Sequence, residues 1–173
     1  MKHLVLVGLP GAGKTTLGRA AAAAAGVDFL DFDEEIERRT GLAPAAYFHR
    51  HGEAAFRAQE LALSRELVGR HTIVVSPGGG WITQQAARDA LRPHAHLVYL
   101  KVSPSVAAQR LGAAVRGRPL LAGNPLVQLE RLLAERGLLY ESADEMLDTE
   151  VVEMQQLTNK LAELANSLRA VTG

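Results

Sequence analysis

The segment Gly8–Thr15 combines residue types and spacing that suit the binding of phosphate. It reads GLPGAGKT and fits the pattern G-x-x-x-x-G-K-[ST], between an apolar run (LVLV, 4–7) and an alanine-rich helical segment. Glycines permit the backbone angles that turn successive N–H groups toward an anion at a helix N-terminus. Lys14 matches the position that reaches the β and γ phosphates, and Thr15 matches the one whose hydroxyl meets Mg²⁺. The segment therefore predicts a nucleotide-binding loop.

Such a loop indicates a nucleotide but leaves the reaction open among small-molecule kinases, GTPases and ATPases. The sequence contains no N-K-x-D stretch of the kind with which GTPases read the base. Motor-like ATPases carry an apolar strand that ends in Asp as a second metal ligand, whereas the run TIVVS (72–76) ends in Ser76. A metal-binding carboxylate must therefore come from elsewhere, and Asp31 is the obvious donor.

Asp31 and Asp33 stand one residue apart in the short apolar segment FLDFD (29–33). Side chains two residues apart in a strand lie on the same face. Read as a strand, the segment places both carboxylates at its end, facing the phosphate loop. Two like charges at that distance need a cation or hydrogen-bond donors.

Three further features could bind a substrate. Arg57 has Glu53 four residues before it and Glu60 three residues after it, which is the spacing of a carboxylate clamp held by acidic neighbours or of an ordinary solvated helix face. The glycines of PGGGW (77–81) would let backbone N–H groups approach a ligand, or would simply form a wide turn. Arg136, at the end of a predicted helix, is either a second clamp or a surface residue.

These residues need a scaffold, and the pattern predicts an α/β fold. Apolar runs of strand length (4–7, 28–32, 72–76 and 96–102) alternate with amphipathic segments, which favours a parallel sheet covered by helices on both faces. Helices are expected from Lys14 to a cap at Gly26, and at about 34–40, 53–69, 83–91, 104–111, 125–136 and 154–170.

Bulk composition narrows the function. The chain of 173 residues is long enough for one domain with a substantial core. Lys+Arg and Asp+Glu are 19 each, so no basic field for nucleic acid is present. The absence of cysteine fits a reducing cytosol, and the apolar run at the N-terminus is too short for a signal sequence or a membrane span. We therefore expect a cytoplasmic protein with no nucleic-acid or membrane partner.

The segment 112–125 has glycines and prolines but no clear periodicity, and its charged residues are both arginines, Arg116 and Arg118. Unpatterned segments of this length in compact domains are often functional lids. We expect a lid at about 112–125 within a single domain that spans 1–173.

Taken together, these pieces resemble the shikimate kinase family over essentially the whole chain. The matching segments occur in family order: GLPGAGKTT, FLDFDEEIERRTG, GEAAFRAQE, the GGG of 78–80, RPLLAG, ERGLLY and LDTE. The ordered set is far more specific than any one of its members.

The resemblance implies a P-loop NTPase fold of the nucleoside monophosphate kinase type, with a five-stranded parallel sheet, and ATP-dependent phosphorylation of the 3-hydroxyl of shikimate. Asp33 would hold the shikimate hydroxyls and accept a proton, while Thr15 and Asp31 would hold Mg²⁺. The expected shikimate contacts are Asp33, Arg57, Gly78, Gly79, Gly80 and Arg136. The expected ATP contacts are Gly11, Ala12, Gly13, Lys14, Thr15, Thr16, Arg110 and Arg118, with Lys14, Asp33 and Arg118 as the catalytic set.

Two other functions stay open at this point. A kinase for another polyol acid, such as gluconate, would share the phosphate loop, and a non-catalytic sensor would bind the same ligands without turnover. The expected partner is the small molecule shikimate, and the expected oligomeric state is a monomer.

Overall fold

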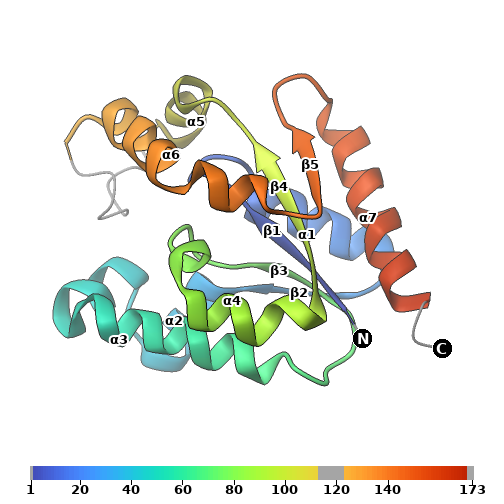
Figure 1. The fold of residues 1–173 in the computed structure, drawn as a ribbon, viewed down its shortest axis with the longest axis horizontal. Coiled ribbons are helices and arrows are strands. Elements are labelled where there is room, and N and C mark those ends of the chain that lie inside the picture. The colour runs from blue at the N-terminus through green and yellow to red at the C-terminus, as the bar shows by residue number, and fades with distance from the viewer. Residues whose placement is uncertain (1, 113–122, 171–173) are drawn as a thin grey trace.

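The structure is a computed structural model that describes residues 2–112 and 123–170 (Figure 1). Its strands are β1 (His3–Val7), β2 (Asp28–Asp31), β3 (Ile73–Ser76), β4 (Ala95–Lys101) and β5 (Glu145–Asp148). Its α-helices are α1 (Lys14–Ala25), α2 (Phe32–Thr40), α3 (Pro44–Glu66), α4 (Gln85–Leu91), α5 (Pro104–Leu111), α6 (Pro125–Glu141) and α7 (Met154–Ala170). Two short 3₁₀ turns, η1 (Trp81–Thr83) and η2 (Arg92–His94), flank α4. No helix in the described ranges is both long and apolar enough to cross a membrane.

The strands form one five-stranded parallel sheet in the order β2-β3-β1-β4-β5. Every residue of β1 and β3 is buried, which explains their unbroken apolar runs. α1 packs against α7, α3 packs against α2 and α4, and α5 packs against α6 (Figure 1). The predicted α/β class is confirmed, and so are four strands to within one residue at each end.

Local sequence signals account for several helix ends. α1 covers the expected Lys14–Ala25, and Gly26 closes it in the left-handed conformation, with its N–H donated to Ala22 and Ala23 carbonyls. The Ser103 side chain accepts the N–H of Val106 at the start of α5, and Asn124 does the same for Leu126 at the start of α6. The proline that follows each of these caps suits the first helical turn.

The structure adds helical residues to two of the predicted helices, α3 and α6. The predicted helix start at 53 is confirmed: α3 is broken at Gly52, whose φ of 83° and ψ of 169° are not helical, and a new helical stretch follows it. The preceding stretch, 44–51, was not predicted, and α3 ends at Glu66, before the expected end at 69. α6 continues to Glu141 beyond the expected end at 136, and β5 followed from the family resemblance, with no apolar run to predict it. The lid expected at about 112–125 falls mostly on 113–122, outside the described residues.

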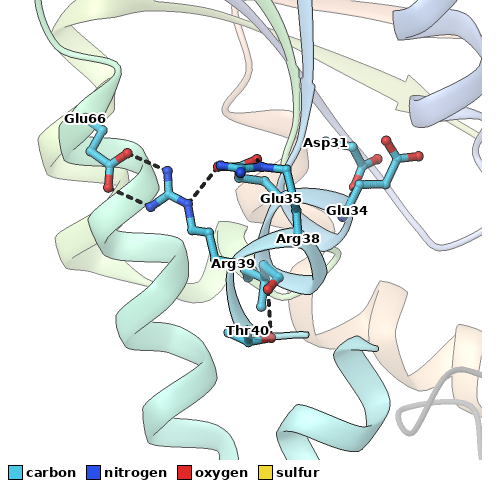
Figure 2. A network of polar contacts seen from close by, with 8 residues as sticks. Asp31, Glu34, Glu35, Arg38, Arg39, Thr40 and Glu66 are labelled. Atoms are coloured by element: carbon cyan, nitrogen blue, oxygen red, sulfur yellow. Dashed lines mark hydrogen bonds and ion pairs between the residues drawn. The ribbon is translucent and has the colours of Figure 1, made fainter. Parts of the chain in front are cut away.

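A polar network joins α2 to the end of α3 (Figure 2). Arg39 donates two parallel hydrogen bonds of 2.7 and 2.6 Å to the carboxylate of Glu66, and a third, of 2.7 Å, to Glu35. Arg38 also donates to Glu35, and its hydrogen bond is the largest cause that lowers the pKa of Glu35 to about 2. The network holds α2, which follows β2 directly, beside the helix that carries Arg57.

Candidate active site

The phosphate loop connects β1 to α1 through glycines whose conformation other residues would resist. Gly11 has a φ of 85° and Gly13, the N-cap of α1, a φ of 91°. A Cβ on Gly11 would lie 2.6 Å from the carbonyl oxygen of Ala107, so the loop also passes too close to α5 to accept a side chain there. The loop therefore leaves the first backbone N–H groups of α1 without helical partners, at the helix end where an anion is stabilised.

The Lys14 side chain folds back onto the start of this loop. Its Nζ donates hydrogen bonds of 2.9 Å to the carbonyl oxygens of both Gly8 and Leu9. These contacts hold the ammonium group beside the wall of a cavity that the loop residues Gly11–Leu17 line. The cavity measures about 490 Å³.

Asp31 lies at the end of β2, opposite Ser76 of β3 in the register of the sheet. Its Oδ2 accepts a 2.7 Å hydrogen bond from Thr15 Oγ1, and its Oδ1 accepts the backbone N–H of Asp33 at 2.9 Å. A hydroxyl and a carboxylate oxygen at the edge of a phosphate site are ligands that Mg²⁺ accepts, since this ion takes one or two protein oxygens and completes its shell with water and phosphate. Thr15 and Asp31 therefore fit the ion by chemistry and by proximity.

Asp33 does not continue the strand, and the expectation of two carboxylates on one strand face is wrong. β2 ends at Asp31, whose side chain caps α2, so Asp33 lies in the first helical turn. The cap wins because Asp31 satisfies two backbone N–H groups, those of Asp33 and Glu34, that a helix start leaves without partners. Both aspartates nevertheless line the same cavity.

Arg57 lies between two acidic residues of α3 that hold it with different strength. Its Nη1 donates a 2.6 Å hydrogen bond to Glu60 Oε2, and Glu60 is fully buried. Its Nη2 and Nε reach the exposed Glu53 only at 3.3 and 3.4 Å. Burial raises the pKa of Glu60 to about 7, with Arg57 opposing this shift and Asp33 adding to it.

The glycine turn at 78–80 follows β3 and lies close to charged groups on three helices. A Cβ on Gly78 would lie 2.7 Å from Glu60 Oε1 and 3.1 Å from Asp33 Oδ1, and one on Gly80 would overlap the Arg57 guanidinium. Arg136 of α6 is buried and donates a 2.6 Å hydrogen bond from Nη1 to the carbonyl of Gly79. The turn therefore brings α2, α3 and α6 to one point.

Trp81, directly after these glycines, packs beneath the turn. It is only 1% exposed, and its Nε1 donates a 2.9 Å hydrogen bond to Ser64 Oγ in α3. The indole therefore supports the turn from the protein interior.

The far end of the cavity is built from α5 and the segment after β5. Arg110 donates hydrogen bonds of 2.8 and 2.7 Å to the side chain and the carbonyl of Thr149, and both residues line the cavity. Val152, Met154 and Leu157 add an apolar wall. The sequence led us to expect Arg110 among the ATP contacts, but it did not single out Thr149.

The cavity thus joins the phosphate loop, Asp31, Asp33, Gly78 and Gly79 to the wall that contains Arg110. Gly80, the last residue of the turn, is not among the described residues that line the cavity, and neither are Arg57 and Arg136, which contact the turn. Arg118 falls within 113–122 and lies outside the described residues.

Comparison with known proteins points in one direction. The family model described as "Shikimate kinase" matches residues 10–166. A shikimate kinase of Thermobifida fusca is 49% identical over 80% of this chain and 79% of its own length. One of Halorhodospira halophila is 42% identical over 93% of this chain and 92% of its own length. The solved structure of a shikimate kinase from Acinetobacter baumannii in complex with shikimate superposes with a TM-score of 0.87 at 38% identity, covering 96% of this chain and 94% of that one. With the sheet order, this likeness confirms a P-loop fold of the nucleoside monophosphate kinase type.

Proposed function

The chain belongs to the shikimate kinase family, and we propose that it transfers the γ-phosphoryl group of ATP to the 3-hydroxyl of shikimate, in the biosynthesis of chorismate and aromatic amino acids. The observation that carries this proposal is the single cavity that joins the phosphate loop to Asp33 and the glycine turn. Phosphoryl transfer needs a donor phosphate and an acceptor hydroxyl side by side, and one cavity with these two walls can hold both.

On the nucleotide side, the proposal assigns binding of the phosphates to the backbone and side chains of residues 11–16. Lys14 would leave its contacts with the Gly8 and Leu9 carbonyls, or extend from them, to meet the β and γ phosphates. A cation held this close needs little reorganisation as charge develops on the phosphoryl oxygens. Arg110 would border the base.

The proposal includes Mg²⁺, which Thr15 and Asp31 would hold. When bound, the ion would neutralise negative charge on the phosphate oxygens. Asp31 would keep its Oδ1 on the backbone of α2 and turn Oδ2 to the ion, directly or through water.

On the acceptor side, Asp33 would hold the shikimate hydroxyls and take the proton of the attacking one. The site needs a carboxylate near that hydroxyl, and Asp33 supplies one from the first turn of α2. Gly78, Gly79 and Gly80 would approach the substrate through their backbone.

Arg57 and Arg136 would bind the shikimate carboxylate, because a planar guanidinium can donate two parallel hydrogen bonds to it. Both already contact the glycine turn. Arg118 is proposed from the family resemblance alone, as the cation that meets the transferring phosphate from the lid.

We further propose that the protein acts as a monomer in the cytoplasm, where ATP is supplied to biosynthetic kinases. The partner is the small-molecule substrate, and no nucleic acid or membrane takes part. Sedimentation at several protein concentrations tests the oligomeric state.

The experiment that tests the function is ADP release by the purified protein with shikimate, quinate or gluconate, each with Mg²⁺ or with excess EDTA. We expect release with shikimate and Mg²⁺ only. Faster release with gluconate would identify a kinase for a different polyol acid. Binding of shikimate and ATP without release of ADP would replace the kinase with a sensor.

A further inference from the structure

Gln84 makes a contact that its position in the sequence does not require. It precedes α4 as the N-cap residue, yet its side chain accepts no N–H of that helix. Its amide instead donates a 2.8 Å hydrogen bond from Nε2 to Glu60 Oε2, across to α3. Glutamine is not one of the residues that usually cap a helix through the side chain, and here its amide is committed to another element.

The Glu60 carboxyl is consequently held by one oxygen. Oε2 receives both Arg57 Nη1 and Gln84 Nε2, while Oε1 is buried, has no hydrogen-bond partner among residues 2–112 and 123–170, and points toward Gly78. A carboxylate and a guanidinium left to themselves favour two parallel hydrogen bonds. Here Gln84 also donates to Oε2, and Arg57 makes only one short hydrogen bond to Glu60, through Nη1.

This arrangement leaves the rest of the Arg57 guanidinium exchangeable. The contacts of Nη2 and Nε are long, 3.3 and 3.4 Å, and they go to Glu53, whose side chain is 63% exposed. A ligand carboxylate could displace such a partner at little cost, because an exposed ion pair of this length contributes little free energy. The short hydrogen bond to buried Glu60 would persist and fix the orientation of the Arg57 guanidinium.

We propose that Gln84 is a positioning residue of the acceptor site, which acts through Glu60 to keep the Arg57 guanidinium turned toward the shikimate carboxylate. Like Glu60 and Arg57, Gln84 is not among the described residues that line the cavity; its side chain reaches Glu60 Oε2, which also accepts Arg57 Nη1, so its effect on substrate passes through these two side chains. The proposal rests on the proposed function, since it assigns Arg57 to the substrate carboxylate. Without the Gln84 donor, the Glu60 carboxylate would rotate and accept hydrogen bonds from Arg57 through both oxygens. The Arg57 guanidinium would then turn away from the shikimate carboxylate.

Two further hydrogen bonds allow a positioning role of Gln84 to be distinguished from a general role in folding. Trp81, in the same turn, donates to Ser64 Oγ at 2.9 Å, and Ser64 Oγ donates to the carbonyl of Glu60 at 2.8 Å. The turn therefore remains attached to α3 when the Gln84 amide is removed, and loss of that amide changes mainly the direction of the carboxyl.

The test is Gln84→Met, which keeps the length of the side chain and removes its donor, against Gln85→Met as the matched control. Gln85 is exposed, and its amide bonds Asp89 on the surface of the same helix. Wild-type turnover of shikimate is measured first, and its absence would overturn the proposed function and, with it, the role of Gln84. Where wild type is active, we expect Gln84→Met to raise the KM for shikimate roughly 10- to 100-fold, because the Arg57 guanidinium would be misplaced relative to the shikimate carboxylate. We expect kcat and the KM for ATP to stay near wild type and Gln85→Met to change nothing. The Tm of Gln84→Met should fall by a few degrees, because a hydrogen bond to a buried carboxyl is lost.

The same substitution in an Arg57→Ala background decides whether Gln84 acts through Arg57. We expect no further rise in the KM for shikimate there, because the effects of two groups in one chain of contacts are not additive. A full additional rise, or an unchanged KM for Gln84→Met alone, would overturn the positioning role and leave the proposed function standing.

Discussion

Thr15 Oγ1 donates a hydrogen bond of 2.7 Å to Asp31 Oδ2, and this contact joins the first turn of α1 to the end of β2. The other oxygen of Asp31 caps α2 by accepting the N–H of Asp33 at 2.9 Å. One carboxylate thus holds the helix that carries Asp33 and faces the site where a cation would bind. The two contributions can be separated, because an amide can replace the capping oxygen but not the charge.

Asp31→Asn should therefore weaken the response to Mg²⁺ while leaving the fold intact. We expect the Mg²⁺ concentration for half-maximal ADP release to rise roughly 10- to 100-fold, with little change in Tm, since Asn is as good a cap as Asp. Asp31→Ala should also lose about 1 kcal/mol of unfolding free energy. An unchanged Mg²⁺ requirement in the Asn variant would remove Asp31 from the metal site, and a fully stable Ala variant would remove its capping role.

Gly80→Ala should disturb the acceptor site without straining the backbone. Gly80 has a φ of −93° and a ψ of −11°, which any residue adopts, but a Cβ there would overlap the Arg57 guanidinium. We expect the KM for shikimate to rise roughly 10- to 100-fold, as when a clamp is misplaced by about an ångström, with the KM for ATP unchanged. The control is Gly137→Ala, beside Arg136 in α6, where an added Cβ meets its nearest atom at 3.9 Å. Equal KM values for the two variants would show that displacing the Arg57 guanidinium does not affect shikimate binding, and would contradict the role of Arg57 as a clamp.

Glu60→Gln should make the fold more stable at alkaline pH. Burial raises the pKa of Glu60 from 4.5 in the unfolded chain to about 7, so this group contributes most to stability below pH 4.5 and loses that contribution as the pH rises through about 7. The loss is on the order of 3 kcal/mol. A glutamine keeps one oxygen for Arg57 and Gln84 and can turn its amide to the otherwise unpartnered Oε1 position. We expect the variant to exceed wild type in Tm at pH 8 and to lose most of that advantage at pH 5. A constant difference in Tm between the two pH values would show that Glu60 does not titrate in this range.

Much of this site could be predicted from short segments of sequence. The phosphate loop depends on glycine angles and on its place between a strand and a helix, and both are readable within about a dozen residues. The position of Asp33 was not readable in the same way. The alternation in FLDFD is compatible with a strand to its last residue. The capping of α2 by Asp31 is a competing local interaction, and it ends the strand at Asp31.

The links among Arg57, Glu60 and Gln84 show where sequence reasoning stops. The spacing of Arg57 and Glu60 on one helix is visible, but the Gln84 contact joins residues 24 positions apart and depends on how α3 packs beside the glycine turn. Nothing distinguishes Gln84 from Gln85 in the sequence, yet one is committed to a buried carboxylate and the other lies at the surface. Only the fold separates them.

Asp33→Asn tests the chemical step itself. The amide keeps the shape of the side chain but cannot accept a proton, so we expect kcat to fall by roughly 10²- to 10⁴-fold. The Kd for ATP, measured by calorimetry, should stay near wild type because Asp33 faces the acceptor end of the cavity, beside Gly78. The matched control is Asp28→Asn at the start of β2, where the carboxylate pairs with His71 at the surface, and it should turn over shikimate at the wild-type rate. Full activity in the Asp33 variant would assign proton acceptance to another group, because the remaining steps, binding and charge neutralisation, do not require a carboxylate at that position.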